Sequence, residues 1–174
     1  MQVLINPQHQ VIANDWLLLS TETELTAEYL AQLAGNNLLV PSALWSVVHQ
    51  ALAGNANLGL YLESHELIEQ LIEELKPALL RQPLIALNFA SFTDGRHFTN
   101  ARLLRERYQF NGEIRAIGDV AVDQLFYLQR CGFNSFTVQA ADQMLALTQL
   151  NAHQPSYQAA CDERLPLYRR RLAL

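Results

Sequence analysis

The stretch PLIALNFA, Pro83 to Ala90, is the strongest indication of fold class in the sequence. It is a continuous apolar run, typical of a strand that is buried on both faces of a parallel sheet, and the strand is expected near residues 84–90. Three further strand-like segments lie near residues 58–63, 114–118 and 135–139. Helical patterns separate them, and this alternation predicts an α/β fold of βα units with a mainly parallel sheet. The pattern fits both a small open sheet and a partial (β/α)-barrel-like sheet.

Two of the intervening helices have a polar residue that can cap them. Ser64 is a candidate N-cap for a helix in which Leu67, Leu71 and Leu75 recur at helical spacing. A second helix is expected over about Phe98 to Tyr108.

A third helix is expected after the strand at residues 114–118. Asp119 is its candidate N-cap, and Ala121, Leu125 and Leu128 are placed on its inward face. The pair Cys131-Gly132 is expected to end this helix, since glycine is common just past a helix C-terminus.

The N-terminal part has strand and turn signals. The segments VLI (residues 3–5) and VIANDWLLLS (residues 11–20) flank the turn-forming NPQHQ, which predicts a β-hairpin. In LLVPSALW, residues 38–45, a strand is expected to pass into a helix that Pro41 opens.

At 174 residues the chain predicts a single domain, residues 1–174, with a proper hydrophobic core. The expected parts are an N-terminal hairpin and helix (1–50), βα units (57–150) and a C-terminal extension (151–174). Half of the residues are apolar and 17% are charged, which is typical of a globular protein.

The net charge of −5 argues against non-specific binding of nucleic acid, which needs a basic face. The N-terminus lacks the basic start and long apolar run of a signal peptide, and no apolar run is long enough to cross a membrane. We therefore expect a cytoplasmic protein without a membrane partner. A homodimer through a helix pair or an exposed apolar edge is a further expectation.

Cysteine usage limits the cofactor chemistry. The two cysteines, Cys131 and Cys161, are far apart in sequence and fit reduced core residues. A cubane iron–sulfur cluster normally needs four cysteine ligands, and no zinc spacing, phosphate-binding loop or dinucleotide fingerprint is present. The sequence thus predicts no metal site and no cofactor bound through a recognisable motif.

The charged stretch FTDGRHFTNARLLRERYQFNGEIRAIGDVAVDQL, Phe92 to Leu125, contains five of the twelve Lys and Arg residues. In a parallel sheet, ligands bind beyond the carboxyl ends of the strands, where the βα loops lie. Two such loops carry Asp94, Gly95, Arg96 and Asp119, so these residues are expected near one another. A guanidinium next to free N–H groups at a helix N-terminus is a good receptor for an anion.

These considerations give a set of candidate site residues. The candidates for proton transfer are Asp94, His97 and Asp119. The candidates for anion binding are Arg96, Arg102, Arg105 and Arg115. The supporting candidates are Gly95, Thr99 (as a helix cap), Gly118, Asp123 and Gln124.

Each candidate also has an ordinary structural interpretation. Asp119 can be a helix cap alone, His97 a loop histidine, and Arg102 half of a surface pair with Glu106. Arg115, inside an apolar strand, is expected to need a carboxylate such as Glu113 or Asp119.

The motifs of the charged stretch resemble a known family. They are the Phe-x-Asp-Gly-Arg loop, Ala-Arg-Leu-Leu-Arg-x-Arg, Gly-Glu-x-Arg-Ala-x-Gly-Asp-Val, Asp-Gln-Leu and Arg-Cys-Gly-Phe. They are similar to a family of short bacterial proteins that has a domain of unknown function and is described as an oxidoreductase involved in sulfite reduction. The chain departs from the family pattern at Phe98-Thr99, at Ala121, and at Asn134, where the family favours aspartate.

The resemblance implies a place in assimilatory sulfite reduction, beside sulfite reductase. Because the chain lacks the ligands for such a redox centre, we expect an accessory protein that acts with sulfite reductase or its electron donor. The alternative is a small enzyme or binding domain for an anionic ligand (sulfite, phosphate or a nucleotide) held by an Arg/Asp site on the βα loops. A third interpretation makes the charges purely structural.

Overall fold

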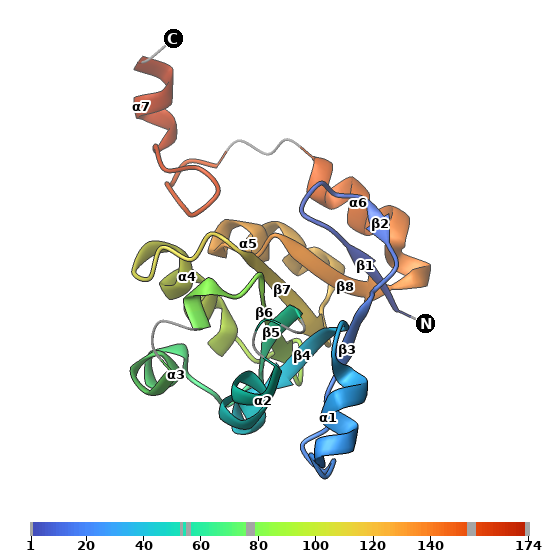
Figure 1. Cartoon of the computed structure of the whole chain (residues 1–174). Helices are drawn as coiled ribbons and strands as arrows, with labels where there is room; N and C mark the ends of the chain where they lie inside the picture. The colour runs from blue at the N-terminus through green and yellow to red at the C-terminus, as the bar shows by residue number, and fades with distance from the viewer. Residues whose placement is uncertain (1, 53, 55–56, 76–78, 153–155, 173–174) are drawn as a thin grey trace.

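The computed structural model describes residues 2–52, 54, 57–75, 79–152 and 156–172 (Figure 1). The strands are β1 (Gln2–Ile5), β2 (Val11–Ile12), β3 (Trp16–Leu18), β4 (Asn37–Pro41), β5 (Asn57–Leu62), β6 (Leu84–Phe89), β7 (Glu113–Gly118) and β8 (Ser135–Gln139). The α-helices are α1 (Ala27–Leu33), α2 (Trp45–Leu52), α3 (Ile68–Leu75), α4 (Arg96–Glu106), α5 (Leu125–Cys131), α6 (Gln143–Asn151) and α7 (Leu167–Leu172). Short 3₁₀ turns, among them Ser42–Leu44 and Val122–Gln124, precede several of the helices.

Within the described residues, the strands form one eight-stranded sheet in the order β2-β1-β8-β7-β6-β5-β4-β3. From β3 to β8 every neighbouring pair is parallel, and β1 pairs antiparallel with both β8 and β2. The predicted α/β fold with a mainly parallel sheet and an N-terminal hairpin is confirmed.

The sheet is curled into a half-barrel, the second of the two forms that the sequence left open. Its two edge strands, β2 and β3, are joined by residues 13–15 alone, and four Cα steps reach at most about 14 Å. Eight strands laid flat would be about 34 Å across. The short link therefore requires strong curvature, which Figure 1 shows with the helices outside the curl.

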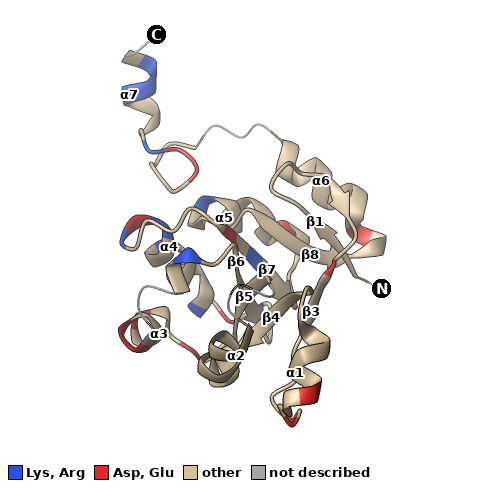
Figure 2. Cartoon of the chain, in the orientation of Figure 1, with Lys and Arg blue, Asp and Glu red and all other residues tan. Residues whose placement is uncertain are grey.

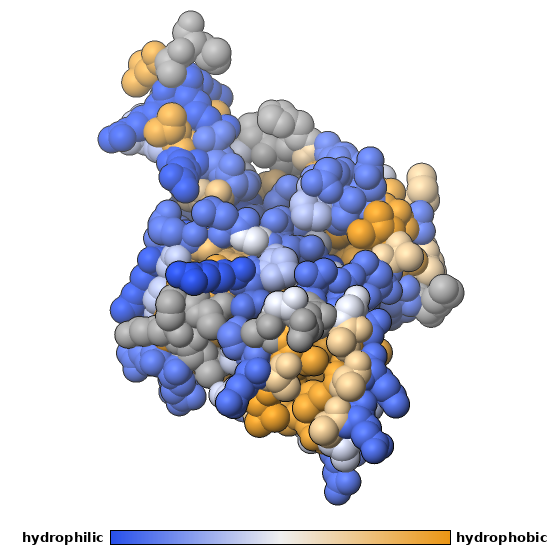
Figure 3. Space-filling model, viewed as in Figure 1, coloured by the Kyte–Doolittle hydropathy of each residue, from blue (hydrophilic) through white to orange (hydrophobic). Residues whose placement is uncertain are grey.

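The two faces of the sheet have different cores. The helix-covered face holds the larger cluster, where Leu60 and Leu87 pack with helix residues such as Trp45 and Leu104. The opposite face carries a small cluster of Leu39, Tyr61, Leu84 and Ala86, packed against Trp16 and Ile117. On the surface, an apolar area lies beside α1 and α2, whereas hydrophilic side chains cover most of the region around α4 (Figure 3). The expected homodimer stays a prediction.

Two sequence-based assignments at the N-terminal side were wrong. The hairpin ends at β2, and Trp16–Leu18 instead pairs with β4 at the other edge of the sheet. The turn of this hairpin is held by the Asn6 Oδ1, which accepts hydrogen bonds from the N–H groups of Gln8 and Gln10. Pro41 is the last residue of β4, and the helical turn begins one residue later.

Ser64 does not cap the helix that follows it. This helix, α3, begins at Ile68, whose N–H donates to the Asn100 Oδ1 of α4 (3.3 Å). Ile68 and Ile72 of this helix are buried, whereas Leu67 is 42% exposed. A cap supplied from a distant helix has no local sequence signal.

The predicted end of α5 is confirmed. Gly132 has a φ of +109°, and the N–H groups of Gly132 and Phe133 bond the carbonyls of Gln129 and Leu128. Leu125 and Leu128 are buried as expected, while Ala121 lies before the helix.

Candidate anion-binding cleft

The predicted site residues lie in three places, because α4 runs back along the sheet from the carboxyl end of β6 to the amino end of β7. Arg96 begins this helix, and Arg105 lies about 13 Å further along its axis. Arg115 lies in β7, buried within the sheet. The four arginines therefore do not form a single site.

Asp94 and Arg96 neutralise each other at the start of α4. The Arg96 Nε and Nη2 donate to the two carboxylate oxygens of Asp94 at 2.9 and 2.6 Å, and the Arg96 N–H donates to Oδ1 at 3.2 Å. The hydrogen bonds from Arg96 lower the pKa of Asp94 to about 2. Asp94 is therefore ionised at neutral pH and is held by the side chain and the N–H of Arg96, which leaves it little capacity to transfer protons.

Asp119 and Gln124 hold the loop that precedes α4. The Asp119 Oδ2 accepts from the Phe92 N–H (3.0 Å), and the Gln124 Nε2 donates to the Phe92 carbonyl (2.8 Å). Asp119 thus lies beside the loop of Asp94, as expected. Its predicted role as a helix cap was wrong, since Ala121 occupies the N-cap position before α5 and its 3₁₀ turn.

Gly118 makes this close approach possible. Its φ is +90°, and a Cβ there would lie 2.3 Å from the Phe89 carbonyl oxygen, which accepts the Asp119 N–H. A side chain at residue 118 would therefore force the βα loops apart.

His97 lies in the core, not in the loop. It is the second residue of α4 and only 1% exposed. Its Nδ1 lies 3.0 Å from the Asn100 Nδ2, and its Nε2 has no hydrogen-bond partner among the described residues. Burial lowers the pKa of His97 to about 4 despite the nearby Asp94 carboxylate. The ring is therefore neutral at pH 7 and closed off from substrates.

Two of the supporting residues have no site role in this geometry. Thr99 lies inside α4, three residues after its start, so it does not cap the helix. Asp123 is exposed and makes no hydrogen bond or ion pair with any described residue.

Arg115 forms a buried ion pair, as its position in an apolar strand predicted. It is 2% exposed, and its Nη2 lies 2.8 Å from the Glu113 Oε1. It also donates to the Ser135 Oγ and the Asn14 Oδ1, and it stacks over Trp16. With its donors and its charge satisfied, Arg115 ties the β2–β3 link to the sheet.

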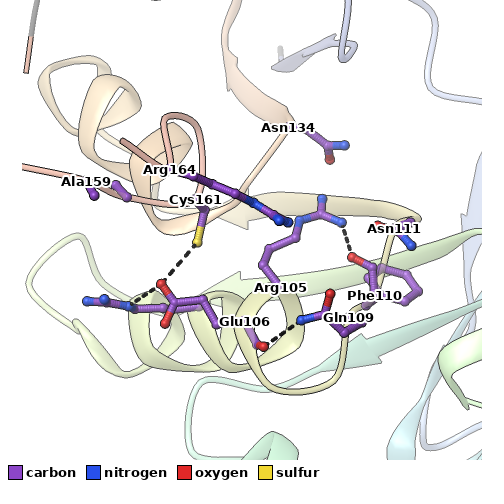
Figure 4. A pocket seen from close by; sticks show the side chains of 11 residues that line it. Arg105, Glu106, Gln109, Phe110, Asn111, Asn134, Ala159, Cys161 and Arg164 are labelled. Carbon is purple, nitrogen blue, oxygen red and sulfur yellow. Dashed lines mark hydrogen bonds and ion pairs between the residues drawn. The ribbon is translucent and has the colours of Figure 1, made fainter. Parts of the chain in front are cut away.

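Arg102 and Arg105 line a cleft of about 560 Å³ at the other end of α4 (Figure 4). Its walls are the C-terminal half of α4, the turn before β7, Asn134 before β8, and a segment of the C-terminal extension. The lining residues are Arg102, Arg105, Glu106, Gln109, Phe110, Asn111, Asn134, Ala159, Ala160, Cys161 and Arg164. Figure 2 shows basic residues on α4 and α5, and others on α7, which projects away from the sheet and its helices.

Arg105 is a fixed cation that has no counter-ion within the part of the chain that the structure describes. Its Nη1 donates to the carbonyls of Phe110 (2.5 Å) and Gly112 (2.8 Å), and its Nε donates to the carbonyl of Gly132 (2.9 Å). Among the described residues no carboxylate pairs with it, and its Nη2 donates to none of them. Burial lowers the pKa of its guanidinium. A partly desolvated charge of this kind is stabilised by an anion.

Arg164 brings a second unpaired cation to the same place. Its side chain reaches toward the Arg105 guanidinium in Figure 4, and it makes no hydrogen bond or ion pair with any described residue. Arg102 differs, because it pairs with Glu106 at 3.0 Å. Two converging like charges repel each other unless an anion lies between them. No sequence pattern singles out Arg164, which lies in the C-terminal extension.

The C-terminal segment is attached to α5 through Arg130. The Arg130 Nη2 donates to the Gln158 carbonyl (2.7 Å), its Nη1 lies 3.4 Å from Asp162, and its carbonyl accepts the Cys161 N–H (3.0 Å). The two cysteines, distant in sequence, are thus brought close in the fold. Burial and the Glu106 carboxylate raise the pKa of Cys161, which disfavours its thiolate.

Across the described ranges, no group of three His, Cys, Asp or Glu side chains is placed to hold a metal ion. None of the helices built from those residues is long and apolar enough to cross a membrane.

Comparison with known proteins finds one family for this chain. No curated protein and no solved structure matches it. The family described as "Bacterial protein of unknown function (DUF934)" matches residues 59–168, a span that includes the whole cleft. The match covers well over half of the chain, so the protein belongs to this family of bacterial proteins of unknown function.

Proposed function

We propose that this protein is an accessory protein of assimilatory sulfite reduction, which binds an oxyanion in the arginine cleft and acts with sulfite reductase or its electron donor. The pathway comes from the resemblance of the Phe92–Leu125 stretch to proteins described in those terms. The oxyanion comes from the chemistry of the cleft.

One observation carries the proposal, namely the convergence of Arg105 and Arg164 without a carboxylate between them (Figure 4). Guanidinium groups match the geometry of oxyanions and hold their charge at any physiological pH. Because three backbone carbonyls fix Arg105 in place, the cation is oriented before a ligand arrives. A preorganised cation loses little conformational entropy on binding.

The accessory role follows from the cysteine count. A six-electron reduction of sulfite needs sirohaem and an iron–sulfur cluster, and a cubane cluster normally takes four cysteine ligands. This chain contains two cysteines. The electrons are therefore supplied by a partner, and the protein described here contributes an anion site or a docking surface.

The alternative with an Arg/Asp site on the βα loops has less support. Asp94 already neutralises Arg96, and His97 is buried beneath the loop. An anion would have to displace a bidentate carboxylate there, whereas Arg105 and Arg164 of the cleft have no carboxylate partner among the described residues.

Growth of a deletion strain tests the proposal. We expect the strain to fail on sulfate and on sulfite as sole sulfur source, and to grow on sulfide and on cysteine. The wild-type gene and Arg169→Gln, an exposed arginine of α7, should restore growth, while Arg164→Glu, which replaces a cation of the cleft by a carboxylate, should not. Equal growth of the deletion strain on all four sources would remove the support for a role in sulfite reduction.

A further inference from the structure

We infer that the cleft binds a phosphate monoester of nucleotide-like size, with its phosphate between Arg105 and Arg164, rather than a free inorganic ion. This inference rests on the proposed function, because it identifies the ligand of the same cleft.

The cleft is large enough for a small organic molecule. Pockets for small organic molecules measure roughly 300–1,000 Å³, and this cleft, at about 560 Å³, lies within that range. A water molecule occupies roughly 30 Å³ of liquid, and a single oxyanion is only a few times larger. A free oxyanion would therefore leave most of the cleft to solvent.

The net positive charge of the cleft matches that of a doubly charged anion. Three arginines and one glutamate line the cleft, and Glu106 neutralises Arg102, so the charges of Arg105 and Arg164 are unbalanced. A phosphate monoester carries about −1.5 to −2 charges at pH 7 and three acceptor oxygens. A carboxylate or a sulfate ester, with one negative charge, would balance only one of the two guanidinium groups.

The remaining walls of the cleft carry hydrogen-bonding groups and small apolar side chains. The Asn134 Oδ1 accepts the Ile114 N–H (2.8 Å), which leaves its amide nitrogen without a described partner. The Gln109 Nε2 donates to the Glu106 carbonyl, which leaves the Gln109 Oε1 free to accept. Ala159 and Ala160 add small apolar contacts. Separate donors, acceptors and methyl groups suit the hydroxyls and ring of an organic body better than a second charge.

The experiment is isothermal titration of the full chain, in low-salt buffer free of phosphate, with five probes. These are adenosine 5′-monophosphate, ribose 5-phosphate, inorganic phosphate, sulfite and uncharged adenosine. We expect one or both monoesters to bind at least about tenfold more tightly than phosphate or sulfite, and adenosine not to bind. The ratio of the two monoesters shows whether a base contributes.

Two variants place the ligand in the cleft. Arg164→Gln removes one cation, and Arg164→Glu replaces that cation by a carboxylate. Each should weaken monoester binding about tenfold, and Arg169→Gln should leave it unchanged. Far-ultraviolet circular dichroism and urea unfolding check that the variants fold.

The outcomes separate the two proposals. If phosphate and sulfite bind as tightly as the monoesters, the inference falls and the oxyanion site of the proposed function stands. Monoester binding that is insensitive to both variants would place the ligand elsewhere and overturn the inference. If none of the four anions binds, the inference and the anion-binding part of the proposed function fall together.

Discussion

The two ends of α4 carry arginines in opposite electrostatic situations. At the N-terminal end, Arg96 forms a bidentate pair with Asp94, and His97 is buried as a neutral ring. At the C-terminal end, Arg105 bonds three backbone carbonyls and has no carboxylate partner among the described residues, and Arg164 reaches toward it. A high density of charged residues in a sequence therefore does not show where an anion-binding site lies, because the charges can pair with one another. The end with the more conspicuous Asp-Gly-Arg motif uses its charges within the fold.

Substituting the arginines at the two ends of α4 should change the free energy of unfolding by very different amounts. Arg105→Ala leaves three backbone carbonyls without their charged donor and should lower the free energy of unfolding by about 4 kcal/mol. Arg96→Ala removes an exposed surface pair and should lower the free energy of unfolding much less. Urea unfolding of both variants measures the difference. Equal losses would show that the N-terminal pair is as important for the fold as the carbonyl clamp.

The pH dependence of stability tests whether His97 is buried and neutral. The pKa of about 4 lies below the ordinary value of 6.5, so the unfolded chain binds more protons between these two pH values. The contribution of His97 to stability is present above pH 6.5, is lost as the pH falls toward 4, and amounts to about 3 kcal/mol. His97→Gln keeps an acceptor for Asn100 and should lack this part of the pH dependence.

The matched control is His65→Gln, because His65 is exposed. Its unfolding curves between pH 7.5 and 4 should follow the wild type. If the stability of His97→Gln changes with pH as that of the wild type does, the His97 ring is protonated in the folded protein. The N-terminal end of α4 would then be open to solvent.

A smaller effect is expected where Asp119 holds the loop before α4. Asp119→Ala leaves the Phe92 N–H without its acceptor, at a position that solvent reaches, and should cost about 1 kcal/mol. Asp123→Ala, four residues on, removes an exposed carboxylate without a described partner and should be nearly neutral. Chemical unfolding of the pair decides between a loop anchor and a simple surface charge.

The core strands were predictable because their chemistry is local. β5, β6, β7 and β8 are short apolar runs bounded by turn residues, and each was placed within about a residue of its observed bounds. β3 was not predictable in this way. It has three residues, and its place at the far edge depends on pairing with Leu38 and Leu39 of β4, which no local pattern specifies.

The cleft was only half predictable for the same reason. Arg102 and Arg105 were expected to bind an anion, since both lie in one charged helix. The structure then separates them, because Arg102 is paired with Glu106. Arg164 has no local signal, since it reaches Arg105 through the return of the C-terminal segment across α5. Asn134 was visible only as a departure from the family pattern, and the structure shows that its amide faces a cationic cleft.

Removing the charge of Arg164 should slightly stabilise the protein, although most substitutions destabilise. Without a ligand, Arg105 and Arg164 repel each other, so Arg164→Gln should stabilise the protein, by about 0.3 kcal/mol at an exposed position. For a chain of this size that corresponds to a rise of about 1 °C in Tm. The rise should disappear in about 0.5 M salt, which screens the repulsion, and Arg169→Gln should not show it. Adding a ligand of the cleft should reverse the order, because the ligand stabilises the wild type more than the variant. A lower Tm of Arg164→Gln in low salt would mean that Arg164 already has an attractive partner, and the cleft would then resemble the N-terminal end of α4.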